Sequence, residues 1–434
     1  MSSDARIEIS SPAEEAWKYE EIGGCRICGN TNLEPVIDLG MQTLTGVFPR
    51  TVDEYVPEGP LELVRCGAGG NTCGLVQLKH IFPKSRLYGH GYGYRSGLNQ
   101  SMVDHLRQLV SRVRGLVALK AGDIVLDIGS NDGTLLSMYD EPDLVRIGID
   151  PTAGKFRQYY QPGIRVVPQF FSKAQFDAEI APGKAAVVTS ISMFYDLEDP
   201  QSFMNQVRDV LAEDGIWVFE QSYLPAMLER NSYDTICHEH VEYYGFGPIA
   251  FMAKQSGLKI LDVETNEANG GSFRIFAAKQ TSTLTGNQQA VADFVAGEAT
   301  YRLGSAATYA AFRERVSLHR TELVTLLDAM RQRGEKVLGY GASTKGNVLL
   351  QYCGITREQM ACVAEVNPDK FGCFTPQARI PILSEQDAKL MNPDAFLVLP
   401  WHFRSFIVSR ETRFVSDGHQ LIFPLPAIDI VRNA

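Results

Sequence analysis

The chain has 434 residues, of which 44% are hydrophobic, so it is long enough for two or three domains with a sizeable core. Its formal net charge of −10, from 51 acidic and 41 basic residues, disfavours a general nucleic-acid-binding protein, which would present a basic face. No apolar run reaches the roughly 20 residues of a membrane span, and the first residues lack the basic and apolar regions of a signal peptide. We therefore expect a cytoplasmic protein that does not bind membranes or nucleic acid.

Four of the eight cysteines lie before residue 75, in two pairs with glycine neighbours. Cys25 and Cys28 are spaced C-x2-C, and Cys66 and Cys73 are spaced C-x6-C. A structural zinc ion takes four thiolates in a tetrahedron, and without a secretion signal such cysteines favour metal over disulfides. The pattern predicts a closed, structural four-thiolate zinc site, with four buried thiols as the alternative.

An aromatic stretch interleaved with glycine, Tyr88–Gly97, follows the cysteines and includes Tyr92 and Tyr94. Glycine-rich aromatic loops are often mobile covers or ligand platforms. The alternative is a surface loop that packs its tyrosines on the core. From Asn99 to Leu119 the apolar spacing is helical.

The run Val125–Gly133 then combines a short apolar segment ending in Asp127 with a turn that has glycines at Gly129 and Gly133. A helix-like pattern opens at Thr134, so the segment predicts the strand, turn and helix of a nucleotide-binding α/β unit. The glycines let the backbone approach a ligand, and a helix start offers unpaired N–H groups. The spacing is G-x-x-x-G and not G-x-G-x-x-G, and it resembles the first motif of class I S-adenosylmethionine (SAM) methyltransferases. An ordinary tight turn is the alternative.

A second strand ends about twenty residues later in Asp150, the usual place for a carboxylate that holds ribose hydroxyls. The strand candidates are Ile124–Asp127, Ile147–Asp150, Ala185–Ile191 and Ile216–Glu220. Helix-like segments such as Gln201–Leu211 separate them, which predicts a mostly parallel sheet with ligands at the carboxyl ends of its strands. The SAM-binding candidates are Asp127, Gly129, Ser130, Asn131, Asp132, Gly133, Asp150, Gln169, Phe170 and Ser190. For Phe170 a core role is equally open.

The segment Asp234–Tyr244 gathers two histidines, two glutamates and two tyrosines in eleven residues, a density that favours proton transfer. A zinc site is the second interpretation, but His238 and His240 do not share a helix face at this spacing and H-E-x-x-H is absent. A solvated loop is the third. The turn Asn269–Ser272, with its two glycines, is expected to edge the same pocket.

Two helices are expected between about Asn287 and Arg333, followed by a second α/β unit. In that unit the strand Val337–Gly341 leads into a glycine-rich loop with Lys345 and a helix start, which suits a diphosphate. The next strands end near Glu365 and at His402. The alternative is a Rossmann-like domain without a ligand.

Together these motifs occur in an order that identifies a family. They are the two cysteine pairs, Asp127–Gly133, Tyr233-Asp-Thr-Ile-x-His-Glu-His240, Asn269-Gly-Gly-Ser, Gly339-Tyr-Gly-Ala-x-x-Lys-Gly-Asn347 and Leu399-Pro-Trp-His. From about Cys25 to near Pro426 the chain resembles the sugar-nucleotide C-methyltransferases of deoxysugar biosynthesis.

The resemblance implies an α/β protein in three parts. A zinc-binding module (20–85) precedes a class I SAM methyltransferase domain with a Rossmann-like fold (86–282). A second Rossmann-like domain (283–434) helps to hold the nucleotide sugar. The implied enzyme uses SAM and a structural Zn²⁺, and removes a proton beside a 4-keto group so that the C3 enolate takes the methyl group. We expect a monomer or a small homo-oligomer.

The resemblance also implies roles for single residues, with His240 as the base and Tyr92 and Tyr94 in a lid. The catalytic candidates are His240, Glu239, His238, Tyr92, Tyr223 and Tyr195. The substrate-binding candidates are Tyr94, Asn269, Lys345, Asn347, Glu365 and His402. The sequence departs from the family at Cys237, which is commonly Tyr, and at Tyr195–Asp196, where a His is common. We hypothesise that Tyr195 or Tyr223 supplies the hydroxyl that is missing at these positions.

Two other functions stay open at this point. One is an O- or N-methyltransferase that uses the same base on a hydroxyl or amine of a nucleotide sugar. The other is a non-catalytic zinc-containing protein that senses ligands. The presence together of Asp127, Asp150, Glu239 and His240 argues against this last interpretation and favours an enzyme.

Overall fold

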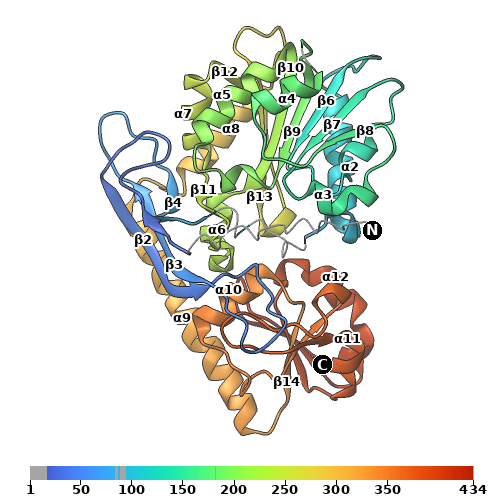
Figure 1. The fold of residues 1–434 in the computed structure, drawn as a ribbon. Helices are drawn as coiled ribbons and strands as arrows, with labels where there is room; N and C mark the ends of the chain where they lie inside the picture. The colour runs from blue at the N-terminus through green and yellow to red at the C-terminus, as the bar shows by residue number, and fades with distance from the viewer. Residues whose placement is uncertain (1–16, 84–86, 88–93, 181, 434) are drawn as a thin grey trace, which may run out of the picture.

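The computed structural model describes residues 17–83, 87, 94–180 and 182–433. Over this part of the chain, three large sheets organise an upper lobe, a lower lobe and a smaller module along their side (Figure 1). We call them the central domain, the C-terminal domain and the cysteine module.

The cysteine module is an antiparallel sheet in which the last strand comes from a distant part of the chain. Its strands in spatial order are β11 (Glu242–Tyr243), β4 (Val76–Leu78), β3 (Glu58–Cys66) and β2 (Leu33–Thr43). Two further short strands, β1 (Glu20–Glu21) and β5 (His80–Ile81), pair with each other. Because Glu242 pairs with Gln77, the chain directly after His240 is anchored to this module.

The central domain contains a sheet of seven strands. Their spatial order is β12 (Leu258–Asn266), β13 (Ser272–Lys279), β10 (Leu211–Ser222), β9 (Ala185–Ile191), β6 (Ile124–Ile128), β7 (Val145–Ile149) and β8 (Ile164–Val167). The five strands from β10 to β8 are parallel and include the four that the sequence predicts, whereas β13 pairs antiparallel with both of its neighbours, β10 and β12. The mostly parallel order brings the carboxyl ends of β6, β7 and β9 to one edge.

The structure corrects the prediction of a helix after Gly133. Only a short 3₁₀ helix, η2 (Leu136–Met138), follows the glycine turn. The Asp132 side chain accepts hydrogen bonds from the Thr134 N–H (3.2 Å) and hydroxyl (2.6 Å), and Pro142 lies before the next strand begins at Val145. A long helix N-terminus therefore does not face this turn.

The C-terminal domain has a sheet of six strands that confirms the second α/β unit. The order is β16 (Ile382–Ser384), β15 (Val363–Glu365), β14 (Val337–Tyr340), β17 (Ala395–Val398), β18 (Gln420–Phe423) and β19 (Asp429–Val431), with β19 antiparallel. The long helix α9 (Ala306–Gln332) runs beside β2 of the cysteine module, where Arg313 donates to the carbonyl of Val36 (2.8 Å) (Figure 1).

Helix α8 (Gln288–Ala299) follows the expected boundary at residues 282–283 but packs on β12 of the central domain. Val291 and Phe294 pack against the hydrophobic core of that domain, because these apolar side chains share one face of the helix. The central domain therefore extends past residue 282 in the structure.

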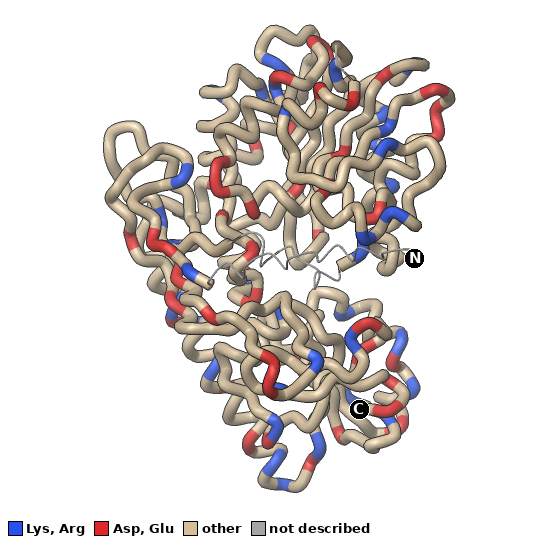
Figure 2. The backbone as a smooth tube through the Cα atoms, viewed as in Figure 1, with Lys and Arg blue, Asp and Glu red and all other residues tan. Residues whose placement is uncertain are grey.

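The other α-helices cover the two large sheets and connect their strands. They are α2 (Gln100–Arg114), α3 (Ala153–Phe156), α4 (Lys173–Ile180), α5 (Pro200–Val210), α6 (Leu224–Glu229), α7 (Phe246–Gln255), α10 (Thr344–Cys353), α11 (Glu385–Leu390), α12 (Arg404–Arg410) and α13 (Thr412–Ser416). Acidic and basic residues are interspersed over both lobes (Figure 2). Among the residues described, none of the helices combines the length and the apolar character of a transmembrane span.

Candidate active site

The four cysteines predicted as metal ligands come together in the cysteine module. Their sulfur atoms all lie within 4.8 Å of one another, and the pairs Cys25–Cys73 and Cys28–Cys66 are 3.4 Å apart. Zn–S bonds of about 2.3 Å in a tetrahedron require sulfurs about 3.8 Å apart, so the cluster fits zinc. Asn30 donates to Cys66 Sγ (3.4 Å), as the supporting residues of metal sites do. Four thiolates leave no open coordination position, which makes the site structural.

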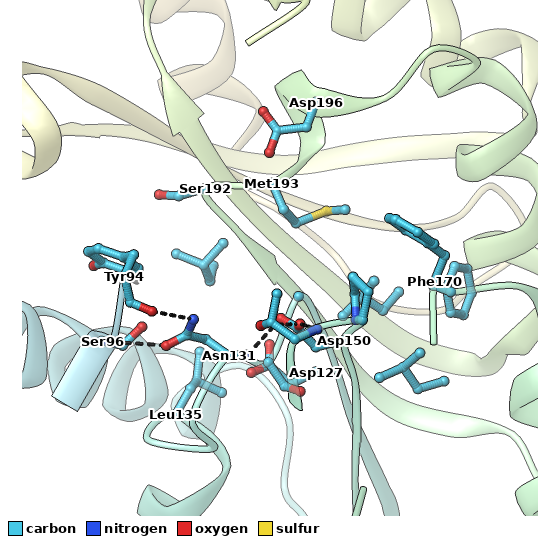
Figure 3. Close-up of a pocket in the computed structure, with 18 of the residues that line it drawn as sticks. Tyr94, Ser96, Asp127, Asn131, Leu135, Asp150, Phe170, Ser192, Met193 and Asp196 are labelled. Carbon is cyan, nitrogen blue, oxygen red and sulfur yellow. Dashed lines mark hydrogen bonds between the residues drawn. The ribbon is translucent and has the colours of Figure 1, made fainter. Parts of the chain in front are cut away.

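A pocket lies at the carboxyl ends of β6, β7 and β9 in the central domain (Figure 3). Six of the predicted SAM-binding residues line it: Asp127, Gly129, Ser130, Asn131, Asp150 and Phe170. The pocket is also lined by Ser192 and by residues that the sequence analysis did not identify as ligand-binding, including Met102 and Leu106 of α2 and Met193 and Leu197 after β9. The helical spacing of Met102 and Leu106 indicates an apolar face of the helix. It does not indicate that this face contacts a ligand.

Two buried aspartates at the floor of the pocket have different surroundings. Asp150 Oδ2 accepts from the Asn131 N–H (2.9 Å), and its Oδ1 accepts from the Thr152 N–H and hydroxyl, both at 2.6 Å. A carboxylate has about four acceptor positions, so Asp150 can also take hydroxyl groups of a ribose. Burial raises the pKa of Asp127 to about 7, although the Thr189 hydroxyl donates to it (2.6 Å) and opposes the shift.

The turn after β6 also holds the segment 94–97 over one side of the pocket. Asn131 Oδ1 accepts from the Ser96 N–H (3.0 Å), and Asn131 Nδ2 donates to the Tyr94 carbonyl (3.0 Å). Asp132 Oδ2 accepts from the Gly97 N–H (3.0 Å), so it positions this segment and does not line the pocket. Tyr94 lines the pocket, and Tyr92 lies outside the described residues.

Three further SAM-binding candidates lie elsewhere. Gly133 sits under the ring of Tyr160, and Gln169 is exposed to solvent. Ser190 Oγ accepts a hydrogen bond from Trp217 Nε1 (2.9 Å) in the core. Since side chains alternate along a strand, the contact of Thr189 with Asp127 directs Ser190 to the opposite face of β9.

The ring of His240 is held by a backbone carbonyl and by the ring of Tyr195. Its Nδ1 lies 3.0 Å from the Thr235 carbonyl oxygen, so Nδ1 carries the proton and Nε2 keeps the lone pair. The ring packs against that of Tyr195, with centroids 4.3 Å apart. Burial, followed by the positive charge of Lys345, lowers the pKa of His240 to about 4, so the imidazole is neutral at pH 7.

Asn269 connects this histidine region to the pocket at the ends of β6, β7 and β9 and to the C-terminal domain. Its Nδ2 donates to Ser192 Oγ (3.2 Å), a residue of the pocket wall, and its carbonyl accepts from Lys345 Nζ (2.6 Å). Asn269 adopts φ 54°, a left-handed conformation that asparagine tolerates. The glycine turn therefore contacts a residue of the pocket wall.

Two of the catalytic candidates, His238 and Tyr223, do not join His240 as the sequence predicts. The structure places both side chains away from His240. His238 Nε2 contacts the Gly59 carbonyl (3.2 Å), and its ring packs edge-on against Phe82 of the cysteine module (4.8 Å). A tight turn, closed by the His240 N–H on the Cys237 carbonyl (3.2 Å), separates the two histidines.

Tyr223 stacks near Phe273 and Phe294, at 4.9 and 5.5 Å between centroids. Burial and the neighbouring Glu298 carboxylate raise the pKa of its hydroxyl. Of the two tyrosines proposed to replace the missing hydroxyl, only Tyr195 therefore lies beside His240.

The remaining substrate candidates surround the loop between β14 and α10. His402 belongs to the 3₁₀ helix η8 (Trp401–Phe403), and burial, together with the charge of Lys345, lowers the pKa of His402. Glu365 accepts from the Ala342 N–H (2.8 Å), an arrangement that repeats that of Asp150 in the central domain. Asn347 donates to the Thr45 carbonyl of the cysteine module (2.8 Å), which makes it a domain contact.

Comparisons with known proteins agree with this architecture. Three family models match in chain order, described as "Putative zinc binding domain" (25–88), "Methyltransferase domain" (99–263) and "C-methyltransferase C-terminal domain" (267–426). The C-methyltransferase NovU of Streptomyces niveus is 31% identical over 409 residues, which is 93% of this chain and 96% of that protein.

Solved structures share only part of the chain. The CcbJ methyltransferase of Streptomyces caelestis (14% identity, TM-score 0.31) covers 40% of this chain and 89% of its own. The mitomycin 7-O-methyltransferase MmcR (14% identity, TM-score 0.33) covers 42% and 55%. Likeness at this level carries no argument about function. Because NovU aligns over nearly all of both chains and the zinc, SAM and C-terminal parts all match, the protein belongs to the C-methyltransferase family and is a SAM-dependent methyltransferase.

Proposed function

We propose that the enzyme transfers the methyl group of SAM to C3 of a nucleotide-linked 4-keto sugar, through an enolate that His240 generates. The observation that carries the proposal is the hydrogen bond from His240 Nδ1 to the Thr235 carbonyl, which leaves Nε2 able to accept a proton. A C–H bond beside a ketone is a weak acid, so its cleavage needs such a base and a donor at the developing oxyanion.

In this reaction His240 Nε2 takes the proton from C3, and the electron pair of that bond moves to form the enolate with charge on the C4 oxygen. The Lys345 ammonium and the Tyr195 hydroxyl are the nearby groups suited to stabilise that charge. C3 then attacks the methyl carbon of SAM, and the sulfonium sulfur leaves as a neutral thioether. The four-thiolate cluster does not act on the substrate, because its four ligands leave no open coordination position.

The support for a nucleotide carrier comes from the C-terminal domain. Its strand β14 leads through Gly341 into α10, whose first turn offers backbone N–H groups to a diphosphate. Glu365 occupies the position that holds ribose hydroxyls in nucleotide-binding sheets. Together with the resemblance described above, this arrangement favours a nucleotide sugar as substrate.

The test is mass spectrometry of the purified protein with SAM and a panel of 4-keto nucleotide sugars. We expect a product heavier by one methyl group and exchange of the C3 hydrogen with deuterated solvent. Methylation without that exchange would instead indicate an O- or N-methyltransferase. The variant His240→Ala should lose most turnover and still bind SAM; wild-type turnover in this variant would refute His240 as the base.

A further inference from the structure

The segment that follows β2 of the cysteine module lies directly on helix α10 of the C-terminal domain. Gln351 Oε1 accepts from the Thr43 N–H (2.8 Å) and hydroxyl (2.9 Å), and Gln351 Nε2 donates back to the Thr43 carbonyl (3.1 Å). One helical turn earlier, Asn347 Nδ2 donates to the Thr45 carbonyl (2.8 Å). Because residues four apart share a helix face, these two amides fix the segment 43–45 along α10.

The next residue of this segment, Gly46, meets the turn that carries His240. The backbone of Gly46 lies against the carboxylate of Glu239. A Cβ at Gly46 would overlap Glu239 Oε1, and it would lie 3.9 Å from Thr344 Oγ1 at the start of α10. The backbone of Gly46 is not left-handed, so glycine is needed here for space and not for its conformation.

The Glu239 carboxylate in turn braces the tight turn Cys237–His240. Burial raises the pKa of Glu239, while hydrogen bonds from its own N–H, the Cys237 thiol and the Gly46 N–H oppose the shift. The same turn is closed by the His240 N–H on the Cys237 carbonyl (3.2 Å). The chain beyond His240 enters β11, which pairs with β4 of the cysteine module. The module thus contacts the base-bearing turn on both sides.

We propose that Gly46 is a positioning residue through which the cysteine module completes the active site: its backbone, which has no side chain, packs against the Glu239 carboxylate and thereby fixes the orientation of His240. The inference rests on the proposed function, in which His240 is the base. It links the fold of the cysteine module to the active site.

The variant Gly46→Ala tests this directly. The obstructing atom is the end of a flexible side chain, so rotation of Glu239 relieves the overlap without unfolding the module. We expect kcat to fall on the order of 10- to 100-fold, because a misplacement of about 1 Å near the chemistry can cost about 100-fold. The KM for SAM, the zinc content and the thermal midpoint should stay near those of the wild type. The matched control is Gly23→Ala, in the same module, where an added Cβ meets no atom within 4 Å.

A double-mutant comparison shows whether Gly46 acts through Glu239. In a Glu239→Ala background the obstructing carboxylate is gone, so adding Gly46→Ala should change kcat by less than about twofold. A large further loss in that background, or wild-type kcat in the single variant Gly46→Ala, would overturn the inference.

Crystal structures of the wild type and Gly46→Ala separate this inference from the proposed function. A Glu239 carboxylate that has left the amide of residue 46 supports the positioning role, whatever substrate the enzyme uses. An unmoved Glu239 with a shifted 43–47 segment would overturn it. Failure of the wild type on every 4-keto nucleotide sugar would count against the proposed function alone.

Discussion

The substitution Lys345→Met should move the acid limb of the pH–activity profile to higher pH. Burial is the larger cause that lowers the pKa of His240 to about 4, and the charge of Lys345 is the next. Methionine removes the charge and keeps the apolar stem, so the pKa of His240 should rise but stay below its usual 6.5, because burial remains. At pH 5 the neutral fraction of the His240 imidazole is about nine-tenths if its pKa is 4, and about one in thirty if its pKa is 6.5.

The assay is kcat/KM against pH, together with NMR titration of the His240 ring, which needs no substrate. The matched control is Lys370→Met, a partly buried lysine of the same domain whose Nζ donates to the Ala342 carbonyl (2.7 Å) and which does not act on His240. We expect the acid limb of the kcat/KM profile and the pKa of the His240 ring to shift in Lys345→Met and not in the control. An unchanged or lower pKa in that variant, or an equal shift in the control, would refute the electrostatic reasoning.

Four other predictions follow from the structure. Cys28→Ser should lower bound zinc below one per chain and cost on the order of several kcal/mol of stability, measured by metal analysis and thermal unfolding; full zinc occupancy would contradict it. Asp150→Asn should weaken SAM binding about 10- to 100-fold by calorimetry, as loss of hydrogen bonds to a charged group does, and unchanged affinity would exclude Asp150 from the site. Tyr195→Phe should lower turnover about tenfold, whereas Tyr223→Phe should lower the thermal midpoint and keep turnover; equal turnover losses would contradict the placement of the two rings. Stability in urea should fall as pH drops from about 6.5 towards 4, because the pKa of His238 is about 4 in the folded chain and the unfolded chain therefore binds the proton first; a flat profile would argue against a neutral buried ring.

Several features of this protein follow from the sequence by itself, because they depend on local pattern. Cysteine pairs with glycine neighbours predict the metal cluster, since short loops must fold back to present their thiols. The strand Ala185–Ile191 is predicted residue for residue, because an apolar run between turn signals has few other structures. The acid at the end of the second strand, Asp150, reaches the pocket, since parallel strands share one carboxyl edge.

The direction of side chains within loops required the tertiary structure. Spacing alone could not separate His238 from His240, because a turn sends one ring into the cysteine module and the other towards Tyr195. It also could not show that Ser190 faces the core, since the face of a strand depends on what packs against it.

The role that we propose for Gly46 could not be predicted from the sequence either, because it depends on a contact between distant segments. Residue 46 and the base-bearing turn are far apart in the chain, and only the docking of the cysteine module on α10 brings them into contact. Local sequence determines which chemical groups the chain carries and which strands present them. Packing between domains decides which of those groups meet, because contacts between distant segments leave no periodic signal in the sequence.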